Sequence, residues 1–222
     1  MNGPGPGFRR RSPLGAVLVA AVVAATALSR VGAADRLTWW LEASWVLAGV
    51  PLAAWVGARR GITPLLQVLL AAHALVLLAG AHWTYERVPL GDWARDALGL
   101  ARNHYDRLGH FMQGFVPAIL ARELLRRTSP LGPGGWLPVL CVACALAFSA
   151  IFEMLEWGAS VSLGHAADAF LGTQGDPWDA QWDMLCCLVG AIASIGAFAG
   201  LTDVHERQLR RLAGRPASLP GA

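Results

Sequence analysis

The sequence contains no lysine and few charged residues of any kind. Charged side chains account for 15% of the 222 residues and hydrophobic ones for 55%, whereas a soluble domain carries roughly 25% charge. The chain also has only four cysteines. This composition excludes a disordered chain, a disulfide-stapled secreted domain and a collagen-like fibre, and it argues against an ordinary soluble globule. All 18 basic residues are arginines set between apolar runs, so they do not form the single patch that would indicate nucleic-acid binding.

Six apolar segments are candidates for helices that cross a bilayer, which needs about 20 residues, although the fourth is short and contains His110, Gln113 and Pro117. They are Leu14–Ala33, Leu41–Ala58, Leu65–Trp83, His110–Leu125, Trp136–Trp157 and Met184–Leu201. Backbone groups in hydrocarbon need internal partners, and the segments lack the alternation of a membrane β-barrel, so helices are expected. The sequence therefore predicts an all-α polytopic protein of about six transmembrane helices within a lipid bilayer. The membrane domain is expected over 13–203, between a disordered basic tail (1–12) and a cytoplasmic tail (204–222).

The placement of the arginines predicts the orientation, because cytoplasmic loops carry an excess of basic residues. With the N-terminus inside, twelve of the 18 arginines lie on the cytoplasmic side, and both termini are cytoplasmic. Twelve of the 15 acidic residues then fall on the outer side, which needs another explanation because acids contribute little to topology. Alternatively, the first segment, which ends in Val31-Gly32-Ala33, is a cleaved secretory signal. Cleavage would leave five spans and the same outer face.

Pairs of ionisable residues occur where four predicted helices meet the outer face. Each pair is three or four residues apart, and such residues share one face of a helix. The pairs are His82 and Glu86, Asp106 and His110, Glu153 and Glu156, and Asp179 and Asp183. Charged groups at membrane depth usually face the interior of the bundle and mark function. We expect the last three pairs to converge in one pocket near the outer surface.

Each pair also has a simpler structural explanation. The three aspartates lie where helices begin, so the capping of free backbone amides could be their whole role. The two glutamates precede a helix end, where a carboxylate opposes the helix dipole, so their structural explanation is a buried arginine partner such as Arg102 or Arg107. His82 could anchor the membrane interface beside Trp83, and His73, in mid-span, is expected to be a hydrogen-bonded core residue.

Carboxylates combined with imidazole suit one divalent metal ion such as Zn, Mn, Fe or Mg. The expected ligands are Asp106, His110, Glu153 and Asp183, and the expected general base for a bound water is Glu156 or Asp179. Five further residues are candidates for the same pocket: His82, Glu86, Arg107, Gln174 and Asp176. Neither an HExxH nor a P-loop pattern is present to name the reaction.

Three classes of function remain open at this point. One is a metal-dependent hydrolase that acts at the outer leaflet. The second is a proton- or ion-coupled transporter of small molecules, and the third is a non-catalytic membrane assembly protein. The hydrolase is favoured because the polar residues gather on one side. A carrier should have polar groups that continue to the inner face, where the helices offer only Gln67, His73 and small residues.

Several long strings resemble a known family. They are Ala81–Tyr85 with Val88–Gly91, Tyr105–Phe111, Gln113–Pro117, Phe152–Glu153 with Glu156–Trp157, and Asp168–Asp179 with Asp183. Over about residues 14–202 the chain resembles the YjdF-like family of predicted bacterial inner-membrane proteins, a domain of unknown function. The resemblance implies a multi-pass protein of the bacterial inner membrane and no particular activity. His104 departs from the family pattern, in which a proline is expected before Tyr105, so whether it joins the site is left open.

Overall fold

A computed structural model of the chain describes residues 12–164, 168–171, 173–197 and 199–214. The tail expected over 1–12 lies outside the described residues except for Ser12. Every regular element in the described part is helical, which confirms the all-α class. The elements are α1 (Pro13–Arg30), α2 (Arg36–Arg60), α3 (Pro64–Trp83), the 3-10 turn η1 (Tyr85–Arg87), α4 (Pro89–Leu98), α5 (Tyr105–Thr128), α6 (Trp136–Leu163), α7 (Asp168–Leu171), α8 (Asp179–Ile192), the π-helical segment η3 (Ala193–Ala197) and α9 (Ala199–Leu212).

The first three helices begin at sequence signals for helix starts. Ser12, Asp35 and Thr63 each accept a hydrogen bond from the backbone amide three residues later, so one free amide of each first turn is satisfied. Pro13 and Pro64 occupy first-turn positions, where no backbone donor is needed. The starts of these helices are therefore fixed locally.

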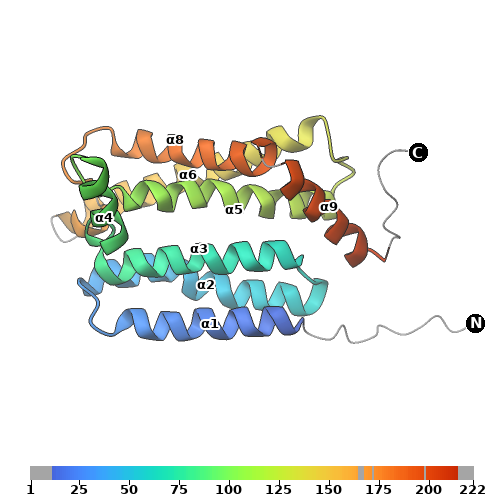
Figure 1. Cartoon of the computed structure of the whole chain (residues 1–222), viewed down its shortest axis with the longest axis horizontal. Coiled ribbons are helices and arrows are strands. Elements are labelled where there is room, and N and C mark those ends of the chain that lie inside the picture. Colours follow the sequence, from blue (N-terminus) through green and yellow to red (C-terminus); the bar gives the residue numbers. More distant parts are fainter. Residues whose placement is uncertain (1–11, 165–167, 172, 198, 215–222) are drawn as a thin grey trace, which may run out of the picture.

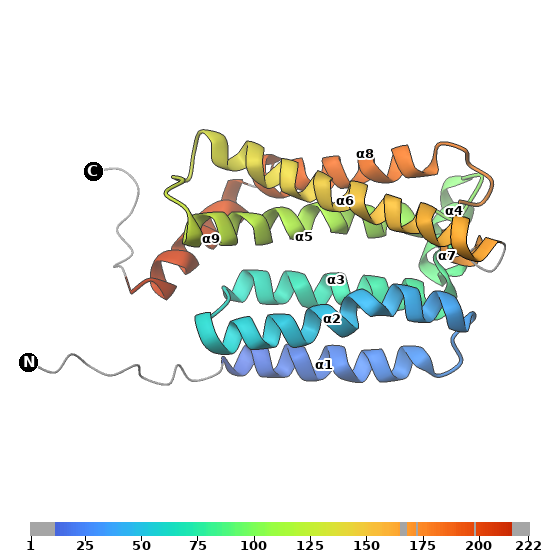
Figure 2. The ribbon, with the colours of Figure 1, turned by 180° about the vertical axis from the view of Figure 1, so that it is seen from behind.

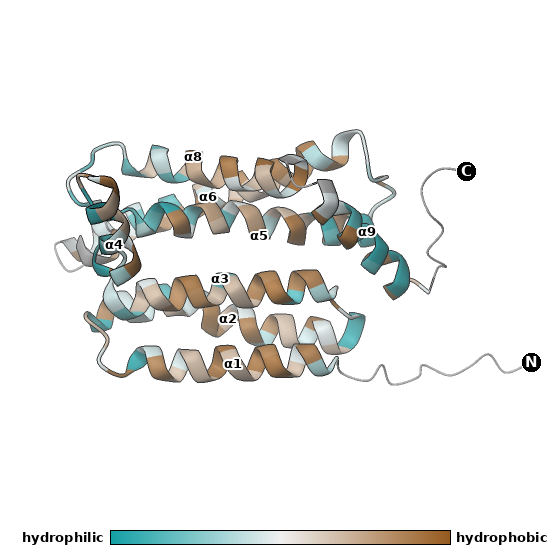
Figure 3. Ribbon diagram, in the orientation of Figure 1, coloured by the Kyte–Doolittle hydropathy of each residue, from teal (hydrophilic) through white to brown (hydrophobic). Residues whose placement is uncertain are grey.

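The long helices form two layers that run along the same axis. Helices α1, α2 and α3 make one layer and α5, α6 and α8 make the other (Figures 1 and 2). Helix α4 lies across one end, where the chain passes from α3 to α5, and α9 lies at the opposite end, inclined to the long helices (Figure 1). Figure 3 shows hydrophobic residues along the long helices and hydrophilic ones near the α4 end and along α9.

Two glycines allow α5 and α8 to touch backbone to backbone. A Cβ at Gly114 of α5 would overlap the carbonyl oxygen of Cys187, and a Cβ at Gly190 of α8 would overlap that of Phe111. Small residues at helix contacts let membrane helices approach this closely. The contact sets the register of α5 against α8, and that register determines which polar residues of the two helices face each other near the α4 end.

Four helices, α1, α2, α3 and α6, are long and apolar enough to cross a membrane. Residues 179–196 and 200–212 would make a fifth span if counted together, but they are bent by 65°. Helix α5 is not apolar enough to be counted as a membrane span by its composition, although it lies alongside α3 and α8 (Figure 1). The polytopic class is confirmed, while the number of six spans and the orientation stay predictions.

The last predicted span differs most from the structure. Helix α8 begins at Asp179, five residues before the predicted start, and η3 and the bend interrupt the helix before α9. Residues 204–212, assigned to a tail from the sequence, form most of α9. His205 and Leu209 of this helix are buried, so it packs against the bundle.

A buried ionic network fastens α9 to α5 at the arginine-rich end. Arg122 donates to Nδ1 of His205 at 2.9 Å, and Nε2 of His205 lies 3.1 Å from Glu123. Because arginine only donates, His205 accepts at Nδ1 and donates from Nε2 as a neutral imidazole. Glu206 pairs with Arg122 at 3.1 Å and with Arg126 at 2.7 Å. Each buried charge in this network therefore has a partner.

Candidate functional site

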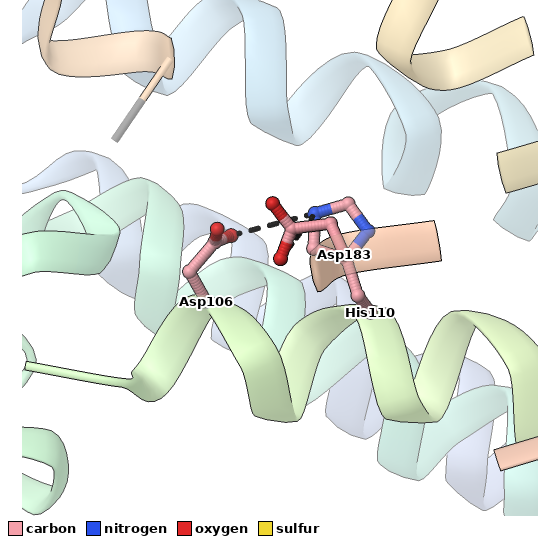
Figure 4. Close-up of side chains that lie close together, drawn as sticks. All are labelled: Asp106, His110 and Asp183. Atoms are coloured by element: carbon pink, nitrogen blue, oxygen red, sulfur yellow. Dashed lines mark ion pairs between the residues drawn. The ribbon is translucent and has the colours of Figure 1, made fainter. Parts of the chain in front are cut away.

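Three of the predicted ligands form a compact group near the α4 end. His110 follows Asp106 by one turn of α5, and both face Asp183 of α8 (Figure 4). Nε2 of His110 lies 3.6 Å from Oδ1 of Asp106 and 3.9 Å from Oδ1 of Asp183. One ligand atom from each residue lies within 4.8 Å of the other two, and all three residues are buried. The geometry could therefore accommodate a metal ion.

Gln113, which the sequence analysis did not select, orients the histidine of this group. Its Oε1 lies 2.7 Å from Nδ1 of His110. An amide oxygen only accepts, so Nδ1 carries a hydrogen, and the neutral form of this ring has its lone pair on Nε2, the nitrogen that faces the two aspartates. Metal-binding histidines usually donate their second ring N–H to such an oxygen. The spacing of three residues from His110 was the available signal for Gln113.

Glu153, the fourth predicted ligand, lies on the other side of the imidazole. Its Oε1 is 3.6 Å from Nδ1 of His110 and is buried without a hydrogen-bond partner. Glu156 lies one turn further along α6. The glutamates of α6 thus border the group of three without joining it.

Two arginines bind the aspartates of α8 and of the loop before it. Arg107 lies 2.5 Å from Asp183, 2.9 Å from Asp179 and 3.3 Å from Asp176. Arg102 lies 2.9 Å from the same oxygen of Asp179. Neither arginine pairs with a glutamate of α6 in the described part of the chain, so the structural explanation offered for those glutamates is not what the structure shows. Oδ1 of Asp179 is therefore shared by two guanidinium groups.

The loop before α8 is held over the helix ends by polar contacts. Gln174 donates to the carbonyl oxygen of Asn103 at 2.9 Å, and Arg102 donates to that of Thr173 at 2.7 Å. Asp176, besides its arginines, accepts from the amide of Trp178. Gln174 and Asp176 therefore hold this loop in place, and neither belongs to the group formed by Asp106, His110 and Asp183.

His104 directly precedes α5 and lies near Arg102 and Arg107. Partial burial and the nearby charges of Arg102 and Arg107 lower its pKa below the ordinary value of 6.5. His104 is therefore neutral at pH 7, and it lies outside the group formed by Asp106, His110 and Asp183.

The structure does not bring His82 and Glu86 to this group. Nδ1 of His82 lies 2.9 Å from the carbonyl oxygen of Ser29, and the ring packs edge-on against Trp83. Glu86 pairs with its neighbour Arg87 at 3.1 Å. His82 therefore links α3 to α1, and Glu86 belongs to a local surface pair.

A buried glutamate of α2 was missed by the sequence analysis. Glu42 is only 2% exposed, and its carboxylate oxygen Oε2 is buried without a hydrogen-bond partner. Among the described residues, four carboxyl groups at this end have no arginine within ion-pair distance: Glu42, Asp106, Glu153 and Glu156. The signal for Glu42 was its isolation in a long apolar segment.

A cavity of about 670 Å³ extends from this site between the two layers of helices. Glu42, Asp106, His110 and Glu156 line one end of it. The rest is lined mainly by aliphatic and aromatic side chains of α1, α2, α3, α5 and α6, and the lining continues to Gln67 near the other end of the bundle. The polar site therefore opens into a long apolar space.

Comparisons with known proteins agree with this architecture. A family model described as "Predicted membrane protein (DUF2238)" matches residues 14–203. The inner membrane protein YjdF of Escherichia coli (strain K12) is 45% identical over 181 residues, which cover 82% of this chain and 85% of that protein. No solved structure matches the chain. The chain belongs to the DUF2238 family and is a polytopic protein of the bacterial inner membrane.

Proposed function

We propose that the protein binds one divalent metal ion between Asp106, His110 and Asp183 and uses it to hydrolyse a substrate at the outer leaflet. One observation carries this proposal. The bond to Gln113 uses Nδ1 of His110, and the other ring nitrogen, Nε2, faces two buried carboxylates. A neutral imidazole held in this way is a common metal ligand.

The distances between the proposed ligand atoms are close to those around a bound metal ion. Atoms at about 2.1 Å from a tetrahedral ion lie about 3.4 Å apart, close to the 3.6 Å between Nε2 of His110 and Oδ1 of Asp106. Arg107 binds Oδ1 of Asp183, so Asp183 would offer its other oxygen, Oδ2, to the ion. Three protein ligands would leave a position open for water, as in catalytic zinc sites.

The surrounding residues supply the other parts of a hydrolytic site. A bound divalent ion would lower the pKa of water to about 7 and polarise the bond to be cleaved. In the proposed step, water attacks an acyl or phosphoryl centre while its proton passes to Glu156. The bond to the leaving oxygen then breaks, and that oxygen takes the proton from Glu156. Glu156 fits this role better than Asp179, because Asp179 is already paired with two arginines.

Metal content tests the binding step without any knowledge of the substrate. We expect one ion per chain in protein purified after supplementation with Zn, Mn, Fe and Mg and analysed for these elements. Asp106→Asn and His110→Ala should lose the ion while the protein still inserts. Asp96→Asn, an exposed carboxylate of α4 paired with Arg95, is the matched control and should keep it. Metal far below one ion per chain in the wild type would contradict the proposal.

The length of the cavity favours a second candidate, a proton- or ion-coupled transporter. The lining runs from Glu42 and Asp106 to Gln67 and Ser12, although the ionic network of α5 and α9 lies at that end. Reconstitution in vesicles with an internal pH-sensitive dye separates the two candidates. Proton flux that Glu42→Gln abolishes would favour transport, whereas bound metal without flux would favour the hydrolase.

A further inference from the structure

We infer that the molecule bound at this site is a single-chain amphiphile, with its apolar chain in the cavity between the two helix layers and its head at the carboxylate–histidine end. That this amphiphile is also the substrate rests on the proposed hydrolytic function. The binding of the chain rests on the cavity itself.

The cavity has the length and depth that a lipid chain requires. On α2 its lining runs from Glu42 to Ala58, which is about 24 Å at a rise of about 1.5 Å per residue. The hydrocarbon layer of a bilayer is about 30 Å thick. The volume of about 670 Å³ is in the range of about 300–1,000 Å³ typical of ligand pockets. The cavity thus runs alongside the lipid chains for most of the membrane.

One face of α2 lines this space and carries the small residues Gly49 and Ala53. Glu42, Val46, Gly49 and Ala53 follow one another at helical spacing and all line the cavity. A Cβ placed on Gly49 would meet no atom within 4 Å. Aliphatic and aromatic lining of this kind gives a water-soluble molecule little to bind, whereas it would bury an acyl chain favourably against its walls.

The polar end of the cavity contains groups that lack partners. Oε2 of Glu42 and Nε2 of His73 are both buried without a hydrogen bond, and both residues line the cavity. An unpaired buried polar group costs free energy, which a ligand would recover by supplying the partner. Carboxyl groups without arginines lie around this end, so a head that donates hydrogen bonds, through hydroxyl or ammonium groups, is complementary to it.

Photo-crosslinking with a defined probe tests the inference. The probe is palmitoyl lysophosphatidylethanolamine with a diazirine on its chain, added to full-length protein in vesicles of phosphatidylethanolamine and phosphatidylglycerol. We expect adducts on cavity-lining residues such as Val50 and Ala71. Gly49→Phe should reduce them at least about tenfold by filling the cavity. Ala48→Phe, at a neighbouring position that does not line the cavity, should leave them unchanged.

Metal analysis of the same samples separates this inference from the proposed function. Adducts in the cavity without bound metal would support the amphiphile and contradict the metal site. Bound metal with adducts only on lipid-facing residues such as Leu47 and Leu75 would overturn the amphiphile and leave the metal site intact. Cavity adducts that survive Gly49→Phe, or crosslinked dimers in which a second copy occupies the cavity, would also overturn it.

Discussion

The chemistry of the site depends on a neutral amide at position 113. Without an acceptor at Nδ1, the imidazole of His110 could turn its N–H toward the aspartates and lose the lone pair that faces them. Oε1 of Gln113 prevents this at 2.7 Å. Burial of both residues removes water as a competing partner. Gln113 is therefore a positioning residue, because it acts through the histidine.

Replacing this amide should weaken metal binding without removing a ligand. Gln113→Leu is expected to lower metal affinity by about 10–100-fold, the usual effect of losing such an outer partner. Gln113→Glu keeps an acceptor oxygen next to Nδ1 and should retain most of the affinity. Titration of the purified variants with Zn²⁺, followed calorimetrically, measures both. Equal affinity in wild type and Gln113→Leu would show that the amide does not orient the ring.

At the residue scale, local spacing could find the site only in part. The interval of four residues from Asp106 to His110 places both on one face of a helix, and the structure shows them there. Spacing could not show that Arg102 and Arg107 engage the aspartates of another helix. It also could not find Glu42, which is distant in the sequence from the other residues at this end of the cavity. Such contacts depend on how helices pack, and no local rule encodes that.

At the element scale, the contact between α5 and α8 assembles the site. The backbone approach at Gly114 and Gly190 lies one to two turns from His110 and Asp183, and no spacer side chain separates the helices there. Glycine costs stability inside a helix, so two of them at one crossing indicate a need for close approach. A longer distance between the axes would move Asp183 away from the histidine.

A larger side chain at this crossing should therefore open the site. Gly114→Val would place a Cβ against the carbonyl oxygen of Cys187, and we expect a loss of about 1–3 kcal/mol in stability together with loss of bound metal. Thermal unfolding in detergent and elemental analysis measure the two effects. Gly158→Val in α6 is the matched control, because a Cβ there meets no atom within 4 Å. The same behaviour in both variants would mean that helix propensity, and not the crossing, is responsible.

The helices were predictable where local signals fix them. Apolar length predicted α1 and α3 within three residues of their observed limits, whereas α2 starts five residues before its predicted start, at Arg36. Helix α5 starts earlier than expected, at Tyr105, whose amide is held by the side chain of Asn103. The break before α9 depends on long-range partners of α9, such as the contact of His205 with Glu123. Periodicity within a single segment carries no information on partners of that kind.

At the scale of the whole molecule, the two ends differ in charge and in what they do. At one end, arginine side chains link the two layers of helices. Arg127 of α5, for example, donates to the carbonyl oxygens of Arg60 and Gly61 at the end of α2. The other end holds the carboxylate–histidine group and the loop of Asp176. Excess arginine marks the cytoplasmic side of a membrane protein, so the acidic end is expected to face outward.

Reporter fusions test that orientation and the passage of α5 through the membrane. Green fluorescent protein fused after Arg60, Arg127 or Arg211 should fluoresce, because these positions are expected in the cytoplasm. Alkaline phosphatase fused within 86–104 or 173–178 should be active, because these positions are expected outside. The fusions after Arg60 and Arg127 together decide whether α5 spans: α3 carries the chain outward, and only a full passage of α5 returns it.

Helix α5 is too polar to qualify by composition alone, so its insertion depends on pairing its charges with neighbouring helices, as Arg107 does with Asp183. Phosphatase activity after Arg127 would show that α5 does not cross, and it would place the arginine-rich end of this helix outside the cell.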